Sequence, residues 1–98
     1  MNILPIATSA LTAASTATAV RANNVANVVT EDFTAAEPLT GLIPNGGGVA
    51  VFVQDTGQPV NLVREIIGLR SALHQYQAAA ELVEAGAEMN KTLIQAFA

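Results

Sequence analysis

The chain has few of the residues that usually build catalytic or disulfide-stabilised domains. It contains no cysteine, so it can form neither a disulfide framework nor a thiolate metal site. Aromatic residues make up only 4% of the sequence, although hydrophobic residues make up 51%. The apolar content is therefore mostly alanine, valine and leucine, which favours slim helices over a thick globular core.

Charged residues are also scarce. They make up 12% of the sequence, about half the share of an ordinary soluble domain, and the formal net charge is -4. This balance leaves no basic patch that could neutralise a phosphate backbone, so nucleic acid is not expected as a partner. With 98 residues the chain is predicted to be a single domain, 1–98, too small for a deep enclosed active site. A surface this poor in charge suggests that other molecules cover part of it.

No set of residues suited to catalysis or metal binding can be assembled. His74 is the only histidine, and no carboxylate stands one helical turn away from it. The glycine run that follows Asn45 lacks the Gly-Lys-Ser/Thr ending of a phosphate-binding loop. Glu31 and Asp32 are adjacent, so in extended backbone their side chains point apart. We expect a protein that is not an enzyme, with no cofactor and no metal.

The segment from Ile3 to Val20 carries no charge, which raises the question of a membrane span or a signal peptide. Six of its eighteen residues are serine or threonine, whereas a spanning helix needs about 20 predominantly apolar residues. A cleaved signal peptide would need a basic segment followed by a compact apolar core, and neither is present. We expect the chain not to span a membrane.

The two ends of the chain both have heptad spacing, which predicts two long helices. Residues 1–29 carry a shallow stripe of Leu4, Leu11, Val25 and Val28, with alanines at the intervening heptad positions. Residues 60–98 follow Asn61, a good N-cap, and carry a longer seam in steps of four and three. The seam residues are Leu62, Ile66, Leu69, Leu73, Tyr76, Ala80, Val83, Ala87, Asn90, Ile94 and Phe97.

The middle of the chain, residues 30–59, is predicted to be loop with a short β element. Prolines and glycines interrupt it repeatedly. Residues 49–54 form a short β-branched run that is expected to pair with a strand near residues 39–43. The predicted fold is therefore mainly α, with the two helices pairing as a coiled-coil hairpin. The seam is expected to be buried against the first helix of the same chain or of another copy.

Two features of these helices ask for a tertiary explanation. Asn23, Asn24 and Asn27 lie close together in a helical segment, although asparagine is a weak helix former whose amide needs a partner. Gly68 and Gly86 lie inside the second helix, where each costs about 1 kcal/mol relative to alanine. Either the helix tolerates these glycines without a packing reason, or another backbone approaches closely at both positions.

The asparagine segment resembles the rod and hook axial proteins of the bacterial flagellum. Those proteins carry a Ser-Ala-Leu helix, then Ala-Asn-Asn-Ile-Ala-Asn, then a Thr-Pro-Gly-aromatic exit. This chain has Ser9-Ala10-Leu11, then Ala22-Asn23-Asn24-Val25-Ala26-Asn27, then Thr30-Glu31-Asp32-Phe33. The second helix is similar too, with Val60-Asn61 at its start, Tyr76 within it, and a late Met89 followed by Leu93. The chain departs from the family where Glu31-Asp32 replaces Pro-Gly and where the middle segment is short.

The resemblance implies a structural subunit of the basal body rod or axial filament. Its partners would be itself and other axial (rod or hook) subunits, and the flagellar type III export apparatus would carry it uncleaved across the inner membrane to a periplasmic rod. An alternative is a binding module that regulates export or assembly by docking on rod subunits without joining the filament. The residues expected in subunit or helix packing are Asn23, Asn24, Val25, Asn27, Leu62, Ile66, Leu69, Leu73, Tyr76, Val83, Met89, Ile94 and Phe97.

A helical hairpin of this size should be only marginally stable alone. Burying seven of the large seam side chains contributes roughly 10 to 20 kcal/mol, and the entropy cost of ordering the helices is larger. We therefore expect the isolated subunit to be partly disordered and its helices to become fully ordered on assembly.

Overall fold

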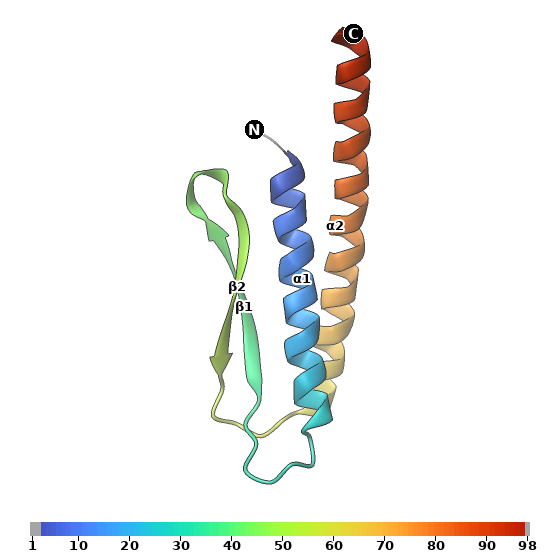
Figure 1. Ribbon diagram of the computed structural model, residues 1–98. Helices are drawn as coiled ribbons and strands as arrows, with labels where there is room; N and C mark the ends of the chain where they lie inside the picture. The colour runs from blue at the N-terminus through green and yellow to red at the C-terminus, as the bar shows by residue number, and fades with distance from the viewer. Residues whose placement is uncertain (1–2, 98) are drawn as a thin grey trace.

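The computed structural model describes residues 3–97 and consists of two long helices joined by a β-hairpin (Figure 1). The elements in chain order are α1 (Ile3–Ala26), β1 (Ala36–Ile43), a single 3-10 turn (Pro44–Gly46), β2 (Gly48–Asp55) and α2 (Leu62–Phe97). The mainly α hairpin fold predicted from the sequence is confirmed. The predicted helices also included residues 1–2 and 98, which lie outside the described residues.

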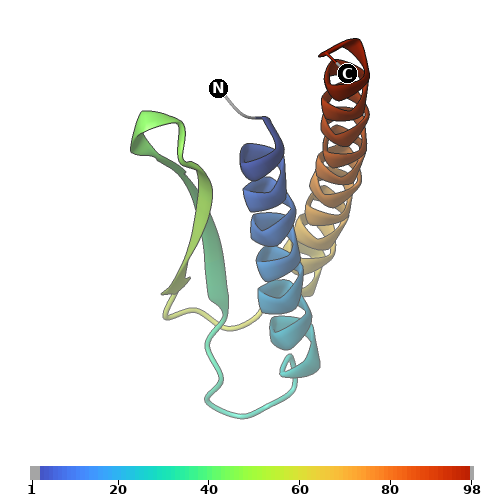
Figure 2. The same cartoon turned by 45° about the horizontal axis from the view of Figure 1, so that its top comes forward.

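The elements lie side by side in a flat, elongated molecule. Helix α1 occupies the middle, with the hairpin on one flank and α2 on the other, and the two helices run antiparallel (Figures 1 and 2). The principal extents are 62 × 24 × 14 Å, so the molecule is little more than one helix thick in its thinnest direction. Because α2 is longer than α1, its last turns extend past the beginning of α1 (Figure 1).

Small residues form the contact between the two helices. On α1 the buried positions include Ala7 and Ala14, and on α2 they include Ala72, Ala79 and Gly86 at a spacing of seven residues. The buried Glu65, seven residues before Ala72, is the one large side chain on this line of α2. This spacing keeps the same line of each helix facing its partner, and small side chains let the two backbones approach closely.

Both glycines of α2 lie where a side chain would meet α1. A Cβ built on Gly86 would lie 3.1 Å from side-chain atoms of Ile3 and Leu4, and one built on Gly68 would collide with the guanidinium group of Arg21. The atoms that crowd both glycines belong to side chains of α1, so the glycines make room for these side chains and the predicted close approach of another backbone is not seen at them.

The face of α2 that packs on α1 differs from the predicted seam by about one residue. Leu69 and Val83 are half-buried, as the prediction requires. Their neighbours along the predicted seam are exposed, and the buried line uses the adjacent positions instead. The exposed seam residues are Leu62, Ile66, Leu73, Tyr76, Ala80, Ala87, Asn90, Ile94 and Phe97. Burial of the whole seam within one chain is thus wrong, because α1 is itself lined with alanine and fits best against the smallest residues of α2.

The hairpin packs on α1 through backbone contacts to small side chains. Strands β1 and β2 are antiparallel with Leu39 opposite Phe52, so the predicted strand at residues 49–54 and its pairing are confirmed. The backbone N–H of Val49 donates to Ser9 Oγ at 3.0 Å, and that hydroxyl donates to the carbonyl of Ile6 at 2.7 Å. Gly48, at φ 94°, lies against Ser9 where any side chain would collide with it.

The exit from α1 keeps a tight turn despite the replacement of Pro-Gly. Asp32 has φ 61°, and the N–H of Phe33 donates to the carbonyl of Thr30 at 3.3 Å. A positive φ at the third residue of a four-residue turn is the position that glycine normally fills, and aspartate tolerates it better than most residues. A tight turn therefore forms here with Glu31 and Asp32 at its two central positions.

Candidate functional site

Asn24 joins the end of α1 to both β1 and α2. Its side chain is fully buried, with 0% exposure. The amide nitrogen donates to the carbonyl of Ala36 at 2.8 Å, and the amide oxygen accepts from the N–H of Ala36 at 3.0 Å. The side chain thus pairs with the backbone at the start of β1 as a neighbouring strand would.

The same amide nitrogen also contacts Glu65 in the first turn of α2. It lies 3.0 Å from each carboxylate oxygen, and Glu65 is only 1% exposed. Arg21 supplies the positive charge, because its Nη1 lies 3.2 Å from Glu65 Oε1 and its Nη2 lies 3.0 Å from Glu37 Oε1. We call Arg21, Asn24, Glu37 and Glu65 the polar junction. This set of charge-assisted hydrogen bonds, buried at Asn24 and Glu65 and partly exposed at Arg21 and Glu37, holds α1, β1 and α2 together at their common end.

The other asparagines of the segment have local roles. Asn23 is exposed, Asn27 is half-buried, and Val25 is half-buried on the last turn of α1. The side-chain amide of Asn27 donates to the carbonyl of Asn23 at 2.9 Å, and its oxygen accepts from the hydroxyl of Thr30 at 3.1 Å. The carbonyl of Asn23 also accepts from the backbone N–H of Asn27 at 3.2 Å, so these bonds reinforce the last turn of α1 and connect it to the exit turn.

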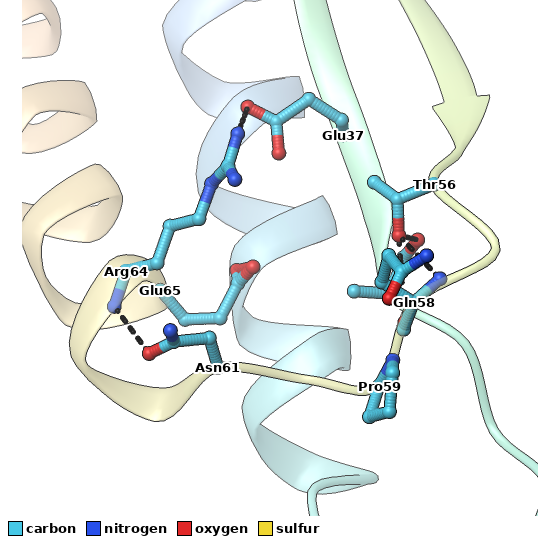
Figure 3. A pocket seen from close by; sticks show the side chains of 8 residues that line it. Glu37, Thr56, Gln58, Pro59, Asn61, Arg64 and Glu65 are labelled. Atoms are coloured by element: carbon cyan, nitrogen blue, oxygen red, sulfur yellow. Dashed lines mark hydrogen bonds and ion pairs between the residues drawn. The ribbon is translucent and has the colours of Figure 1, made fainter.

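Asn61 caps the start of α2, as predicted. Its side-chain oxygen accepts from the N–H of Arg64 at 3.2 Å. This cap fixes the first turn so that Glu65 points toward α1 and Arg64 points toward Glu37, at 3.6 Å (Figure 3). The cap therefore positions the polar junction as well as the helix.

A polar pocket of about 270 Å³ opens beside the polar junction (Figure 3). Its lining residues are Ala35, Glu37, Thr56, Gln58, Pro59, Asn61, Arg64 and Glu65. Among the described residues, every buried side-chain nitrogen and oxygen has a hydrogen-bond partner. The pocket therefore presents no buried polar atom that needs a ligand, and its charged groups are engaged in holding the fold.

The loop before α2 is ordered by Asp55. Its carboxylate accepts from the hydroxyl of Thr34 at 2.8 Å and from the N–H of Gly57 at 2.8 Å. The bond from the Gly57 backbone, followed by the bond from Thr34, lowers the pKa of Asp55 from its ordinary value of 3.8. This turn returns the chain from β2 to the start of α2.

The predicted packing residues of α2 fall into two groups. Leu69 and Val83 contribute to the contact with α1, whereas the side chains that face away from α1 form an exposed surface. Beyond Gly86, no described element covers α2. The large side chains on this overhang, residues 87–97, are all more than half exposed and are Met89, Leu93, Ile94 and Phe97.

Sequence reasoning missed the charged members of the polar junction. Arg21, Glu37 and Glu65 were not predicted as packing residues, because charged side chains are usually solvated. One signal was present in the sequence. Arg21 is the only charged residue among the first thirty, which marks it as a charge retained for a specific partner.

The remaining chemistry of the described chain is limited. Residues 3–97 contain no group of three or more His, Asp or Glu side chains placed to hold a metal ion. Helix α1 is long and apolar enough to cross a membrane by length and composition alone, and it lies near the N-terminus. In the structure it is flanked by α2 and the hairpin, and it ends in the polar junction.

Two family models match the chain, one at each end. Residues 4–34 match the flagella basal body rod protein family, and residues 57–96 match the C-terminal family of flagellar basal body rod FlgEFG proteins. The first match covers α1 and its exit turn, and the second covers nearly all of α2. The whole hairpin lies between them. No curated protein is significantly similar to the chain.

Proposed function

The chain belongs to the flagellar rod and axial protein family, and on this premise we propose that it is a structural subunit that self-assembles through its paired terminal helices. Membership supports a structural role in the basal body and a non-enzymatic protein. The finer proposal is that the subunit joins the periplasmic rod or axial filament. It would do so by contacting other axial subunits and further copies of itself.

The observation that carries this proposal is the uncovered end of α2. Within the described chain the overhang has no partner, yet it holds Leu93, Ile94 and Phe97, and Phe97 is 86% exposed. Burying such side chains against a neighbour contributes about 1.5 to 3 kcal/mol each. The antiparallel pair of α1 and α2, joined at one end by the polar junction, holds this overhang in a defined direction for a neighbouring subunit.

The test is a strain that lacks the protein, scored for flagellar assembly, with purified basal bodies examined for the chain. We expect the chain in wild-type basal bodies and a defect in rod assembly in the deletion strain. Complementation with Ile94→Ser/Phe97→Ser should reduce incorporation, because the variant removes apolar side chains that the proposal places against a neighbouring subunit. Both side chains are strongly exposed in the subunit, so the change should leave its fold intact. Val29→Ser, which alters another strongly exposed apolar residue outside α2, is the matched control. Basal bodies free of the protein would contradict the proposal.

A second candidate function is an assembly-regulating module that docks on rod subunits without joining the filament. The short connection between the helices favours it, because only the hairpin and its flanking loops, residues 27–61, separate α1 from α2. The same experiment distinguishes the two. A regulator would alter assembly in the deletion strain and yet be missing from purified basal bodies.

Export of the intact chain without membrane insertion is part of the proposal. Six serine and threonine hydroxyls in the first helix and the buried Arg21 near its end argue against a stable lipid-facing span. We expect alkaline carbonate to release the protein from membranes when the export apparatus is disabled. Retention in the carbonate-resistant pellet would instead support a role for α1 as a span.

A further inference from the structure

We propose that α2 pairs with α2 of a second copy in antiparallel orientation, forming a closed dimer whose two-fold axis lies at the height of Ala78. The contact surface is the apolar stripe, defined here as Leu62, Ile66, Leu69, Leu73, Tyr76, Ala80, Val83, Ala87, Asn90 and Ile94. Eight of these ten predicted seam residues are exposed, and the other two, Leu69 and Val83, are half-buried toward α1.

The apolar stripe is accessible in the subunit. Leu73 is 53% exposed. The stripe runs along α2 next to the line of buried residues that packs on α1. The hairpin and α2 lie on opposite flanks of α1 (Figure 2). A shallow depression of about 250 Å³ borders the stripe, between Tyr76 and the α1 residues Leu11, Thr12, Ser15 and Thr16.

The sizes of the side chains favour antiparallel pairing. Large residues occupy the first half of the stripe, and alanines occupy much of the second half. In the antiparallel register Leu69 lies beside Ala87 of the second copy, Leu73 beside Val83, and Tyr76 beside Ala80. In these three central layers a large residue faces a smaller one, which packs well, whereas the outermost layer pairs Leu62 with Ile94. The poorest layer is Ile66 beside Asn90.

A parallel pair would pack less well. Alanine would face alanine in the second half, at a helix separation that the leucine layers of the first half set. The resulting voids would lose contacts on both sides.

The charges of α2 are segregated in the same direction. The exposed charges of its first third are Arg64 and Arg70, because Glu65 is buried in the polar junction. Glu81, Glu84 and Glu88 lie in the second half, where Lys91 is the one basic exception. The antiparallel register brings Arg70 beside Glu84 of the second copy, once on each side of the two-fold axis. Parallel pairing would instead bring the acidic halves together, which is unfavourable.

The dimer has a consequence for assembly that rests on the proposed function. A contact in which both copies use the same surface is closed and cannot extend into a filament. An axial filament of subunits that all point the same way cannot contain it. The dimer would therefore cover the apolar stripe before assembly and release it only when a subunit joins the rod.

Sedimentation equilibrium of the purified full chain tests the dimer. We expect a reversible dimer, and either Arg70→Glu or Glu84→Arg should raise the dissociation constant on the order of tenfold, because two favourable pairs become repulsive. The double variant restores opposite charges and should recover most of the affinity. Glu31→Arg, an equal change of charge in the exposed exit turn, is the control. A monomer at all concentrations, or a double variant as weak as the singles, would overturn the proposal.

Cysteine trapping tests the orientation, since the chain has no cysteine of its own. In the antiparallel dimer Ile66→Cys of one copy lies beside Asn90→Cys of the other, and both positions are exposed in the subunit, whereas two copies of the same variant hold their thiols about 36 Å apart. Disulfide-linked dimers should therefore form in an equimolar mixture and not from either variant alone. Cross-linking of each variant with itself would show a parallel pair and reject the inference. Circular dichroism confirms that both variants remain helical.

The dimer and the proposed function fail separately. A chain that is monomeric in solution but present in basal bodies would refute the dimer and leave the function intact. A dimeric chain that is missing from basal bodies would keep the contact and refute its role in masking an assembly surface.

Discussion

At the scale of single residues, Asn24 is the side chain on which the most elements depend. Its one amide group bonds the backbone of β1 in both directions and also donates to the carboxylate of Glu65. Asparagine suits this position because it carries donors and an acceptor on a short side chain without a charge. The neighbouring Asn23 makes no comparable contact, which shows that the repeated asparagines of this segment are not equivalent.

Asn24→Ala should lower the free energy of unfolding by about 3 kcal/mol or more. The change leaves both backbone groups of Ala36 without their partner and removes a donor from the buried carboxylate of Glu65, and each such loss costs about 1 to 3 kcal/mol. Urea denaturation followed by far-UV circular dichroism measures the effect. Asn23→Ala is the matched control, with an expected loss below about 0.5 kcal/mol. Similar losses in the two variants would contradict the role assigned to Asn24.

The turn before α2 should respond to acid through Asp55. Its pKa is lowered in the folded chain, so the stabilisation is fully present above the unfolded pKa and is lost as the pH falls through the folded pKa. A carboxyl-detected NMR titration should place the midpoint of Asp55 below 3.8. Thr34→Val removes one of its two donors and should move the midpoint upward. An unchanged midpoint in this variant would show that the hydroxyl does not hold the carboxylate.

At the scale of elements, the contact between α1 and α2 depends on glycines, which carry no side chain, as much as on alanines. Gly68 lets the guanidinium of Arg21 lie against the backbone of α2, where it reaches both Glu37 and Glu65. The alanines at heptad spacing extend this close approach along the full length of α1. The contact is narrow, which explains why so much apolar surface of α2 remains outside it.

Gly68→Ala should destabilise the protein although alanine is the better helix former. Alanine gains about 1 kcal/mol of helix propensity, but its methyl group would displace Arg21 from a buried ion pair whose disruption costs about 3 kcal/mol or more. We expect a net loss of about 2 kcal/mol in thermal or urea unfolding. Ser71→Ala, an exposed position of the same helix, should change stability by only a few tenths. A stabilising Gly68→Ala would show that Arg21 relocates without cost.

The heptad repeat shows how far the sequence could specify these elements. The two helices, the hairpin between them and the N-cap Asn61 were predictable, because periodicity and capping are local signals. The face of α2 that packs on α1 was not. Hydropathy favours Leu62, Ile66 and Leu73, but the alanine surface of α1 selects the adjacent line of Ala72, Ala79 and Gly86. Which of these two neighbouring lines of α2 packs on α1 depends on the shape of the α1 surface. The sequence of α2 by itself does not contain that information.

The candidate site was predictable in part for the same reason. The asparagine segment stands out because its amides need partners, and the structure supplies them for Asn24 and Asn27. Glu65 could not be identified, since an acidic residue in the first turn of a helix ordinarily interacts with the helix dipole in solvent. Its burial follows only from the meeting of α1, β1 and α2 at one end of the molecule.

At the scale of the whole molecule, the thin shape limits the stability of the isolated chain. With a smallest extent of 14 Å, the fold buries few large side chains completely. We expect dilute protein to show partial helicity in far-UV circular dichroism and a broad thermal transition, and helicity should rise with concentration. Full, cooperative helicity in dilute monomer would contradict this expectation and would show that the polar junction and the alanine contact suffice.

The polar junction also determines how the molecule yields to force. Helix α1 begins and α2 ends toward the same end of the molecule, and the junction lies at the opposite end (Figure 1). Tension that separates the two ends of the chain therefore peels the helices apart one turn at a time, starting where only small apolar contacts resist. The ion pairs of Arg21 would break last. An unfolding machinery that pulls on either end of the chain would therefore need its greatest force at the last stage of separating the helices.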